Sequence, residues 1–172
     1  MGRGRRPRTG RTNRDQPRLT ILANGMRSWH LNDKRHREDG PAIEWPSGKR
    51  QWWLNGQPHR SDGPAIDYPD GSEWWLNGQR HREDGPAVER ADGKREWWLH
   101  GELHRDDGPA IEREDGTREW WLGGQLHRED GPAVELPDGT GEWWLDGARQ
   151  PDPDHEPIAA PGRRSRASAL AE

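Results

Sequence analysis

A polar motif with the residue types of catalytic and metal sites, His-Arg-x-Asp-Gly-Pro-Ala, occurs five times in this 172-residue chain. Its His residues follow one another at intervals of 23, 22, 23 and 23 residues. The His and Asp positions are His36, His59, His81, His104, His127, Asp39, Asp62, Asp84, Asp107 and Asp130. Imidazole and carboxylate groups bind metals and transfer protons, so metal binding, catalysis and a structural role all have to be weighed.

Metal binding fits this spacing poorly. Zinc holds an imidazole nitrogen at about 2.0–2.1 Å, so two ligands of one ion lie within roughly 4 Å of each other. In a β array, equivalent His residues of successive repeats would be two strand spacings apart, roughly 9.5 Å. Calcium at the Asp-rich turns is opposed by the Arg of every motif. We therefore predict no metal site and no cofactor.

Catalysis is also poorly supported. His104-Arg105-Asp106 matches the triplet of the protein-kinase catalytic loop, but no Gly-rich phosphate loop or Asp-Phe-Gly accompanies it, and the chain has neither Phe nor Cys. His-Glu-x-x-His and Gly-x-Ser-x-Gly are absent as well. A catalytic site brings unlike residues together at one point, whereas a repeat offers the same surroundings five times. We predict that the protein is not an enzyme.

A structural role for the motif is the interpretation that we favour. His and Arg precede a tight turn, where Asp can cap backbone N–H groups and pair with Arg of its own or the next unit. Repeated copies would then build a ladder of charge and hydrogen bonds along one edge of the array. The His and Asp positions given above are its expected members.

A Trp-Trp-Leu step repeats at the same period as the polar motif. The paired indoles are Trp52, Trp53, Trp74, Trp75, Trp97, Trp98, Trp120, Trp121, Trp143 and Trp144. A degenerate copy, Trp29-His30-Leu31, opens the series. A period near 23 that is kept so faithfully indicates a stacked array in which each unit contacts only its neighbours.

Two turn signals flank the Trp pair of each repeat. One is Asp-Gly or Ser-Gly, as at Ser47-Gly48, and the other is Asn-Gly or an equivalent, as at Asn55-Gly56. Such dipeptides tolerate the positive φ angles of two-residue hairpin turns. No window has a helical apolar period. The predicted fold class is all-β: tandem β-hairpin repeats of about 23 residues, with about two strands each, form an elongated single-layer sheet or solenoid.

The composition limits what can form the core. Leu, Ile, Val and Phe make up 11 % of the chain, below the roughly 20 % that usually supports a packed core, so no conventional aliphatic core is expected. No apolar run reaches the roughly 18 residues of a membrane span. Neighbouring strand residues point to opposite faces, so the first Trp should share a face with Leu and the second should lie on the other. We expect a core of indoles. The alternative is that one Trp row stays partly exposed and forms a binding groove.

The segment Trp75-Leu76-Asn77-Gly78-Gln79-Arg80-His81, followed by Gly85 and Asp92-Gly93, resembles the MORN repeat. That family also has a repeat of about 23 residues with an aromatic residue, Asn-Gly, a basic residue and His-Gly before a strand and Asp-Gly. This chain departs from it by lacking the family's Gly near the aromatic strand and by carrying Arg-x-Asp-Gly-Pro-Ala after His. The resemblance implies a single-sheet hairpin array that acts in protein–protein contact or dimerisation, sometimes with membrane association.

A second, weaker resemblance concerns Trp-Trp-Leu-Asn-Gly, which is similar to the aromatic hairpins of choline-binding and glucan-binding cell-wall repeats. There, indoles cage quaternary ammonium groups or stack on sugars. Two functional hypotheses follow. The first is a non-enzymatic scaffold whose extended sheet face binds a protein partner or a second copy of the chain. The alternative is a ligand-binding array in which the ten paired Trp residues bind carbohydrate or quaternary ammonium groups.

Charge divides the chain into three expected parts. Residues 1–18 carry seven Arg and one Asp, and we expect a basic disordered arm that offers a weak possibility of nucleic-acid or membrane-surface binding. Residues 19–150 carry a net charge of −9, so we expect this array of five full repeats and one degenerate copy to bind no nucleic acid. Residues 151–172 are expected to be a disordered Pro/Ala/Arg-rich tail. With no Cys and no secretory signal, a cytoplasmic location is predicted.

Overall fold

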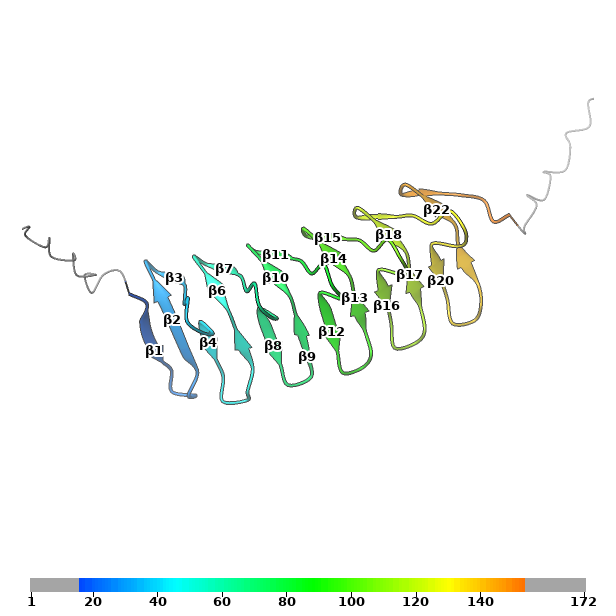
Figure 1. Ribbon diagram of the computed structural model, residues 1–172. Coiled ribbons are helices and arrows are strands. Elements are labelled where there is room, and N and C mark those ends of the chain that lie inside the picture. Colours follow the sequence, from blue (N-terminus) through cyan, green and yellow to red (C-terminus); the bar gives the residue numbers. More distant parts are fainter. Residues whose placement is uncertain (1–15, 154–172) are drawn as a thin grey trace, which may run out of the picture.

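The computed structural model describes residues 16–153, and it shows an elongated row of β-hairpin units standing side by side (Figure 1). These residues contain no helix, and the sheets are open. The predicted all-β array of tandem hairpins is therefore confirmed. Residues 1–15 and 154–172, which make up most of the two expected terminal segments, lie outside the described residues. Within the described part, no helix is long and apolar enough to cross a membrane.

One long sheet runs the length of the array, and all its strand pairs are antiparallel. Its strands are, in spatial order, β1 Arg18–Ile21, β2 Arg27–Leu31, β4 Ile43–Glu44, β5 Arg50–Gln51, β8 Ile66–Tyr68, β9 Gly71–Glu73, β12 Val88–Arg90, β13 Arg95–Glu96, β16 Ile111–Glu112, β17 Arg118–Glu119, β20 Val134–Glu135 and β21 Gly141–Glu142, with β3 Lys34–Arg35 paired to β2.

Each full unit adds a small hairpin beyond the long sheet, so it has four short strands where the sequence predicted about two. The hairpins are β6 Trp53–Leu54 with β7 Gln57–Pro58, β10 Trp75–Leu76 with β11 Gln79–Arg80, β14 Trp98–Leu99 with β15 Glu102–Leu103, β18 Trp121–Leu122 with β19 Gln125–Leu126, and β22 Trp144–Leu145 with β23 Ala148–Arg149.

The extra strands arise because the strand that leads into each Trp pair changes its hydrogen-bonding partner at the first Trp. The N–H of Trp52 donates to the carbonyl of Ala65 in the next unit at 2.7 Å, and its carbonyl accepts from the N–H of His59 in its own unit at 3.1 Å. Before this residue the strand pairs with β4 of its own unit and with β8 of the next unit, and after it the strand pairs with the return strand β7 of its own hairpin. One continuous strand in the sequence thus becomes two in the structure.

The two turn signals form different turns. At Asn55-Gly56 both φ angles are positive, 52° and 84°, as the two-residue hairpin turn requires. At Ser47-Gly48 only Gly48 has a positive φ, 91°, and the loop has three residues, because Gly48 N–H donates to the Trp45 carbonyl and Trp45 N–H to the Lys49 carbonyl. The two-residue prediction was therefore wrong for this turn, where a three-residue loop with a left-handed Gly closes the hairpin.

The one 22-residue interval reflects a shorter loop. In that unit Tyr68 pairs directly with Gly71, which leaves only Pro69 and Asp70 between the strands. Gly71 lies in β9, and a Cβ atom there would lie 2.4 Å from the carbonyl oxygen of Glu89 on the neighbouring strand. Close approach of two backbones, and not a positive φ, therefore requires glycine at this position.

The buried core is aliphatic and small, which corrects the expectation of a core of indoles. It consists of the Ala-Ile or Ala-Val step that follows each Gly-Pro; the buried members are Ala42, Ile43, Ala65, Ile66, Ala87, Val88, Ala110, Ile111 and Ala133. All twelve Trp residues are half-buried. Two adjacent buried residues per unit point to opposite faces of the sheet, so a single layer has a thin core on each side, and the indoles cover it.

We predict that Gly71→Ala destabilises the array by on the order of 1–3 kcal/mol, because the added methyl group forces β9 away from β12. Urea unfolding followed by Trp emission would measure the change. Ser72→Ala, one residue further along the same strand, is the matched control and should be nearly neutral. A Gly71→Ala protein as stable as the Ser72→Ala protein would contradict this account of the backbone contact.

Candidate functional site

The two faces of the array carry different side chains. Register pairs Ile43 with Gln51 and Gln51 with Ile66, and residues paired across antiparallel strands share a face. That side also holds the second Trp of each step, two residues after Gln51, and we call it the Glu–Trp face. The other side holds the first Trp and the Leu of each step, and we call it the Trp–Leu face. The predicted division of the ten paired indoles between two faces is what the register produces.

On the Trp–Leu face, the Arg of each polar motif lies over the indole of the first Trp in its own unit. The guanidinium carbon is 4.0 Å from the ring centroid of Trp97 for Arg105 and 3.9 Å from that of Trp120 for Arg128. The other such pairs are Arg37 with Trp29, Arg60 with Trp52 and Arg82 with Trp74. These distances are those of cation–π contacts.

The same guanidinium holds the motif loop in shape. Arg105 donates from Nε to Asp107 at 2.8 Å, and from Nη1 to the carbonyl of Pro109 at 3.2 Å and to Glu112 at 3.4 Å. The hydrogen bond and charge of this Arg lower the pKa of the Asp107 carboxyl. The motif Asp thus pairs with Arg of its own unit and not with the next one. Backbone capping falls instead to the turn Asp, as where Asp92 accepts from the N–H of Lys94 at 2.9 Å.

The motif His residues connect neighbouring units. Nδ1 of each accepts the backbone N–H at the next unit's hairpin turn, at 3.1–3.2 Å. The pairs are His36 with Asn55, His59 with Asn77, His81 with His100, His104 with Gly123 and His127 with Asp146. Backbone hydrogen bonds between the same units accompany this ladder, since the N–H of Arg60 donates to the carbonyl of Trp75 in the next unit. Of the ten expected ladder residues, the five His therefore span the units and the five Asp do not.

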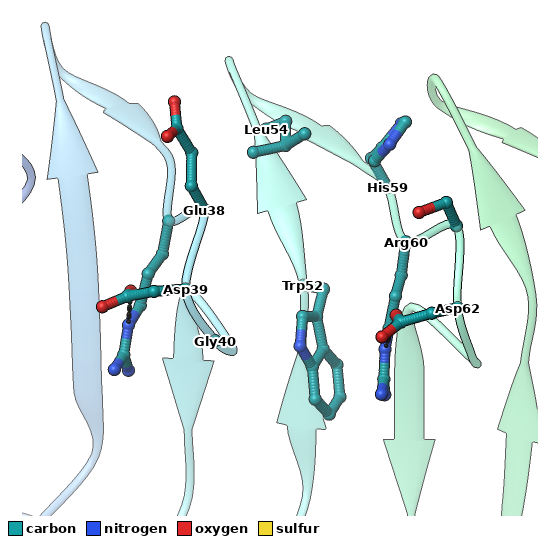
Figure 2. A pocket seen from close by; sticks show the side chains of 10 residues that line it. Glu38, Asp39, Gly40, Trp52, Leu54, His59, Arg60 and Asp62 are labelled. Atoms are coloured by element: carbon teal, nitrogen blue, oxygen red, sulfur yellow. Dashed lines mark hydrogen bonds and ion pairs between the residues drawn. The ribbon is translucent and has the colours of Figure 1, made fainter.

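Shallow grooves cross the Trp–Leu face between consecutive motif loops. Figure 2 shows one of about 430 Å³, whose floor is Trp52 and Leu54 and whose walls are the loops that carry Asp39 and Asp62. Equivalent grooves lie over Trp97 with Leu99 and over Trp120 with Leu122. Glu38, Asp39 and Asp62 project from the walls in the view of Figure 2, while Arg60 stands beside the indole and His59 is level with Leu54.

The Glu–Trp face carries a row of buried polar side chains that the sequence analysis did not single out. Gln51, Glu73 and Glu96 are buried, and the row continues with Glu119 and Glu142. Each accepts a hydrogen bond from Nε1 of the second Trp of its own step, at 2.8–3.1 Å. A usable signal was present, because Gln or Glu stands directly before every Trp pair except the degenerate first one.

Two of these buried carboxylates have lowered pKa values. Burial alone would raise the pKa of Glu73, but hydrogen bonds from Arg90 at 2.5 Å and Trp75 at 3.0 Å, with the charge of Arg80, outweigh it. Burial likewise opposes ionisation of Glu96, and Lys94, Trp98 and Arg80 overcome it. Both groups are therefore held as paired anions within the sheet.

Arg80 joins these two carboxylates. Its guanidinium lies 5.2 Å from the ring centroid of Trp75 and 5.1 Å from that of Trp98 in the next unit, and it reaches Glu73 and Glu96 at 3.4 and 3.7 Å. The equivalent residues of the neighbouring units are Pro58 and Leu103. The middle of the array thus has an ion-pair network in place of the apolar contacts that these neighbours can make.

Within residues 16–153, no three His, Asp or Glu side chains are grouped so that they could hold a metal ion. A scan against protein-family models finds no match to the chain, and a search of curated proteins finds none either.

We predict that Arg105→Gln destabilises the array by on the order of 1–3 kcal/mol, because it removes the contact with Trp97 and the three hydrogen bonds that the guanidinium donates to Asp107, Pro109 and Glu112. Arg118→Gln in the next unit is the control, since this exposed Arg meets Glu135 only at 3.8 Å and should change stability by less than about 0.5 kcal/mol. Equal urea midpoints for the two variants would show that the guanidinium does not stabilise the loop.

We also predict that the array loses stability in acid. Because the folded pKa of Glu96 lies below the ordinary value of 4.5, its contribution is complete above about pH 4.5 and is lost as the pH falls through the lowered folded pKa. Glu96→Gln should flatten this dependence in urea titrations between pH 6 and 2, and exposed Glu114→Gln should not. Parallel pH curves for wild type and Glu96→Gln would refute the assignment.

Proposed function

We propose that the protein is a non-enzymatic repeat scaffold whose Trp–Leu face binds a polypeptide, either a protein partner or a second copy of the chain. The observation that carries the proposal is the recurrence of one groove, built each time from the same Trp, Leu and motif loops. A surface that repeats itself suits an extended partner with many similar contacts, since each groove adds a small increment of binding.

Two features support a non-enzymatic role. The motif His and Arg side chains are already engaged with a backbone N–H and with an indole, an Asp and a carbonyl. The grooves are also open and alike, which gives no place where unlike groups converge. The MORN-like relationship remains part of this proposal, supported by the period near 23 residues and by the Asn-Gly turns with two positive φ angles.

The alternative, an array that binds quaternary ammonium groups or sugars through its indoles, has less support. A cation of the chain itself already occupies one face of each first Trp from Trp29 to Trp120, so an ammonium ligand would have to displace a guanidinium that holds its loop. Among the second indoles, Trp53, Trp75 and Trp98 also lie against Arg.

Trp emission separates the two hypotheses. We expect no shift or quenching on titration with choline or with oligosaccharides, because the indole faces are engaged. Replacement of Trp97 and Trp98 by Ala should instead lower the unfolding midpoint of the whole array, because loss of the two indoles uncovers the neighbouring core residues. A saturable emission change that disappears in this variant while the fold survives would favour the ligand-binding array.

The scaffold role is tested by charge placed on the Trp–Leu face. Leu99→Lys combined with Leu122→Lys should abolish self-association measured by light scattering, or abolish retention of a cross-linked partner. Leu136→Lys, at a residue that is 41 % exposed on the Glu–Trp face, should leave both intact. If the two Lys substitutions reduce neither self-association nor retention of the partner, the proposal is wrong.

A further inference from the structure

The walls of the grooves carry regularly spaced carboxylates that are almost fully in solvent. They belong to the x-Asp pair of each motif, and their side chains are 72–86 % exposed. The nine are Glu38, Asp39, Asp62, Glu83, Asp84, Asp106, Asp107, Glu129 and Asp130. In four of the five loops, two such carboxylates stand beside one guanidinium, so the face has a net negative charge at each of these steps.

The grooves between these walls are spaced like the cations of a segment in the same chain. Grooves lie over Trp52, Trp97 and Trp120, and Trp74 holds the equivalent repeat position between the loops of Asp62 and Asp84. Two strand spacings of about 4.8 Å put neighbouring grooves at roughly 9.6 Å. In residues 1–15, which lie outside the described residues, Arg5, Arg8, Arg11 and Arg14 recur every third position. Three residues of extended chain span about 10 Å, and three of polyproline II about 9.3 Å.

Charge and chain length agree with this match. Residues 1–18 carry seven Arg against one Asp, while residues 19–150 have a net charge of −9. The described chain starts at Gln16 beside β1, at the end of the row nearest the groove over Trp52 (Figure 1). Arg5 lies eleven residues before Gln16, and eleven extended residues reach about 36–40 Å. The groove over Trp120 is nine strand spacings, roughly 43 Å, from β1, so the extended Arg5 side chain has to cover the remainder.

We propose that residues 3–14 bind along the Trp–Leu face of their own array, with Arg14, Arg11, Arg8 and Arg5 entering the grooves over Trp52, Trp74, Trp97 and Trp120 in that order. Each guanidinium meets carboxylates of two consecutive loops beside the Leu of the groove, and the motif Arg keeps its place on the indole. The tether gives the arm an effective concentration in the millimolar range, so it competes with any other polypeptide for the face. The inference rests on the proposed role of that face, and it makes the arm its internal competitor.

Cleavage of the full-length chain by trypsin tests the proposal. A bound arm is cut only when it leaves the groove, so cleavage after Arg8 and Arg11 should be roughly tenfold slower at about 20 mM than at about 500 mM NaCl, where charges are screened. Cleavage after Arg163 and Arg164, near the other end of the chain, is the internal reference and should not respond in this way. Mass spectrometry follows each bond separately.

Two sets of variants locate the contact. Glu38→Gln, Glu83→Gln, Asp106→Asn and Glu129→Gln together remove wall charges but keep the Asp–Arg pairs, and they should abolish the low-salt protection. Asp33→Asn, Asp70→Asn, Glu102→Gln and Glu114→Gln remove as much charge away from the grooves and should leave it. Exchanging Arg8 with Thr9 and Arg11 with Thr12 keeps the composition of the arm but breaks the three-residue spacing of its Arg residues, so protection from trypsin should fall. Free peptides of residues 1–18, one with the natural and one with the exchanged sequence, give the intrinsic rate of cleavage for each protein.

The opposite results would overturn the inference. Arm bonds cut as fast as in the free peptide at low salt would show that the arm is not bound. Equal loss of protection in both charge-removed proteins, or none in the spacing variant, would reduce the contact to unspecific attraction. Protection that rises with protein concentration would mean binding to a second copy and refute the intramolecular form. An unprotected arm together with Leu99- and Leu122-dependent association would leave the proposed scaffold function standing.

Discussion

A single layer of sheet has no second layer to pack against, so it must cover both of its faces with its own side chains. The rest of this structure depends on that constraint. The apolar residues buried in each full unit are an Ala and, in the first four units, an Ile or Val, far less than a conventional core. On one face the motif loop folds back over the sheet, held by an Arg that lies on an indole and binds Asp, a carbonyl and Glu. On the other, indoles hydrogen-bond to a buried carboxylate row.

Cohesion along the row comes from contacts between neighbouring units only. Backbone pairs such as Trp52 N–H to the Ala65 carbonyl, the His Nδ1 ladder and strand pairs such as Glu96 with Ile111 each link one unit to the next. Stability of such an array is approximately a sum of unit and interface terms, so a change in one unit is felt mainly at its two interfaces. The network around Arg80 is one of these contacts, and it joins two neighbouring units through ion pairs where the units on either side carry Pro58 or Leu103.

The chemistry of the two faces differs because each face of the single layer is covered by different side chains. On the Glu–Trp face, Glu73 and Glu96 are matched by Arg or Lys and lie within the sheet, so they serve the fold. On the Trp–Leu face, one carboxylate of each motif is used by Arg, and the other, where present, lies no closer than 3.3 Å to His Nε2. Solvent-exposed carboxylates and half-buried apolar side chains thus lie together on the Trp–Leu face, which is why the proposed binding role is assigned there.

The period, the all-β class, the Asn-Gly turns and the division of the Trp pairs between two faces follow from the sequence alone, because turn chemistry and strand alternation are local properties. Which residues are buried depends on tertiary contacts. Composition predicted indoles, but a bulky ring on a single layer can be covered on one side only, whereas the small Ala is fully buried on the face that the motif loop covers and the Ile or Val beside it on the opposite face. Hydrogen bonds that only the folded chain makes also decided the number of strands per unit and the three-residue turn. They likewise decided that the motif His binds the next unit and the motif Asp only its own.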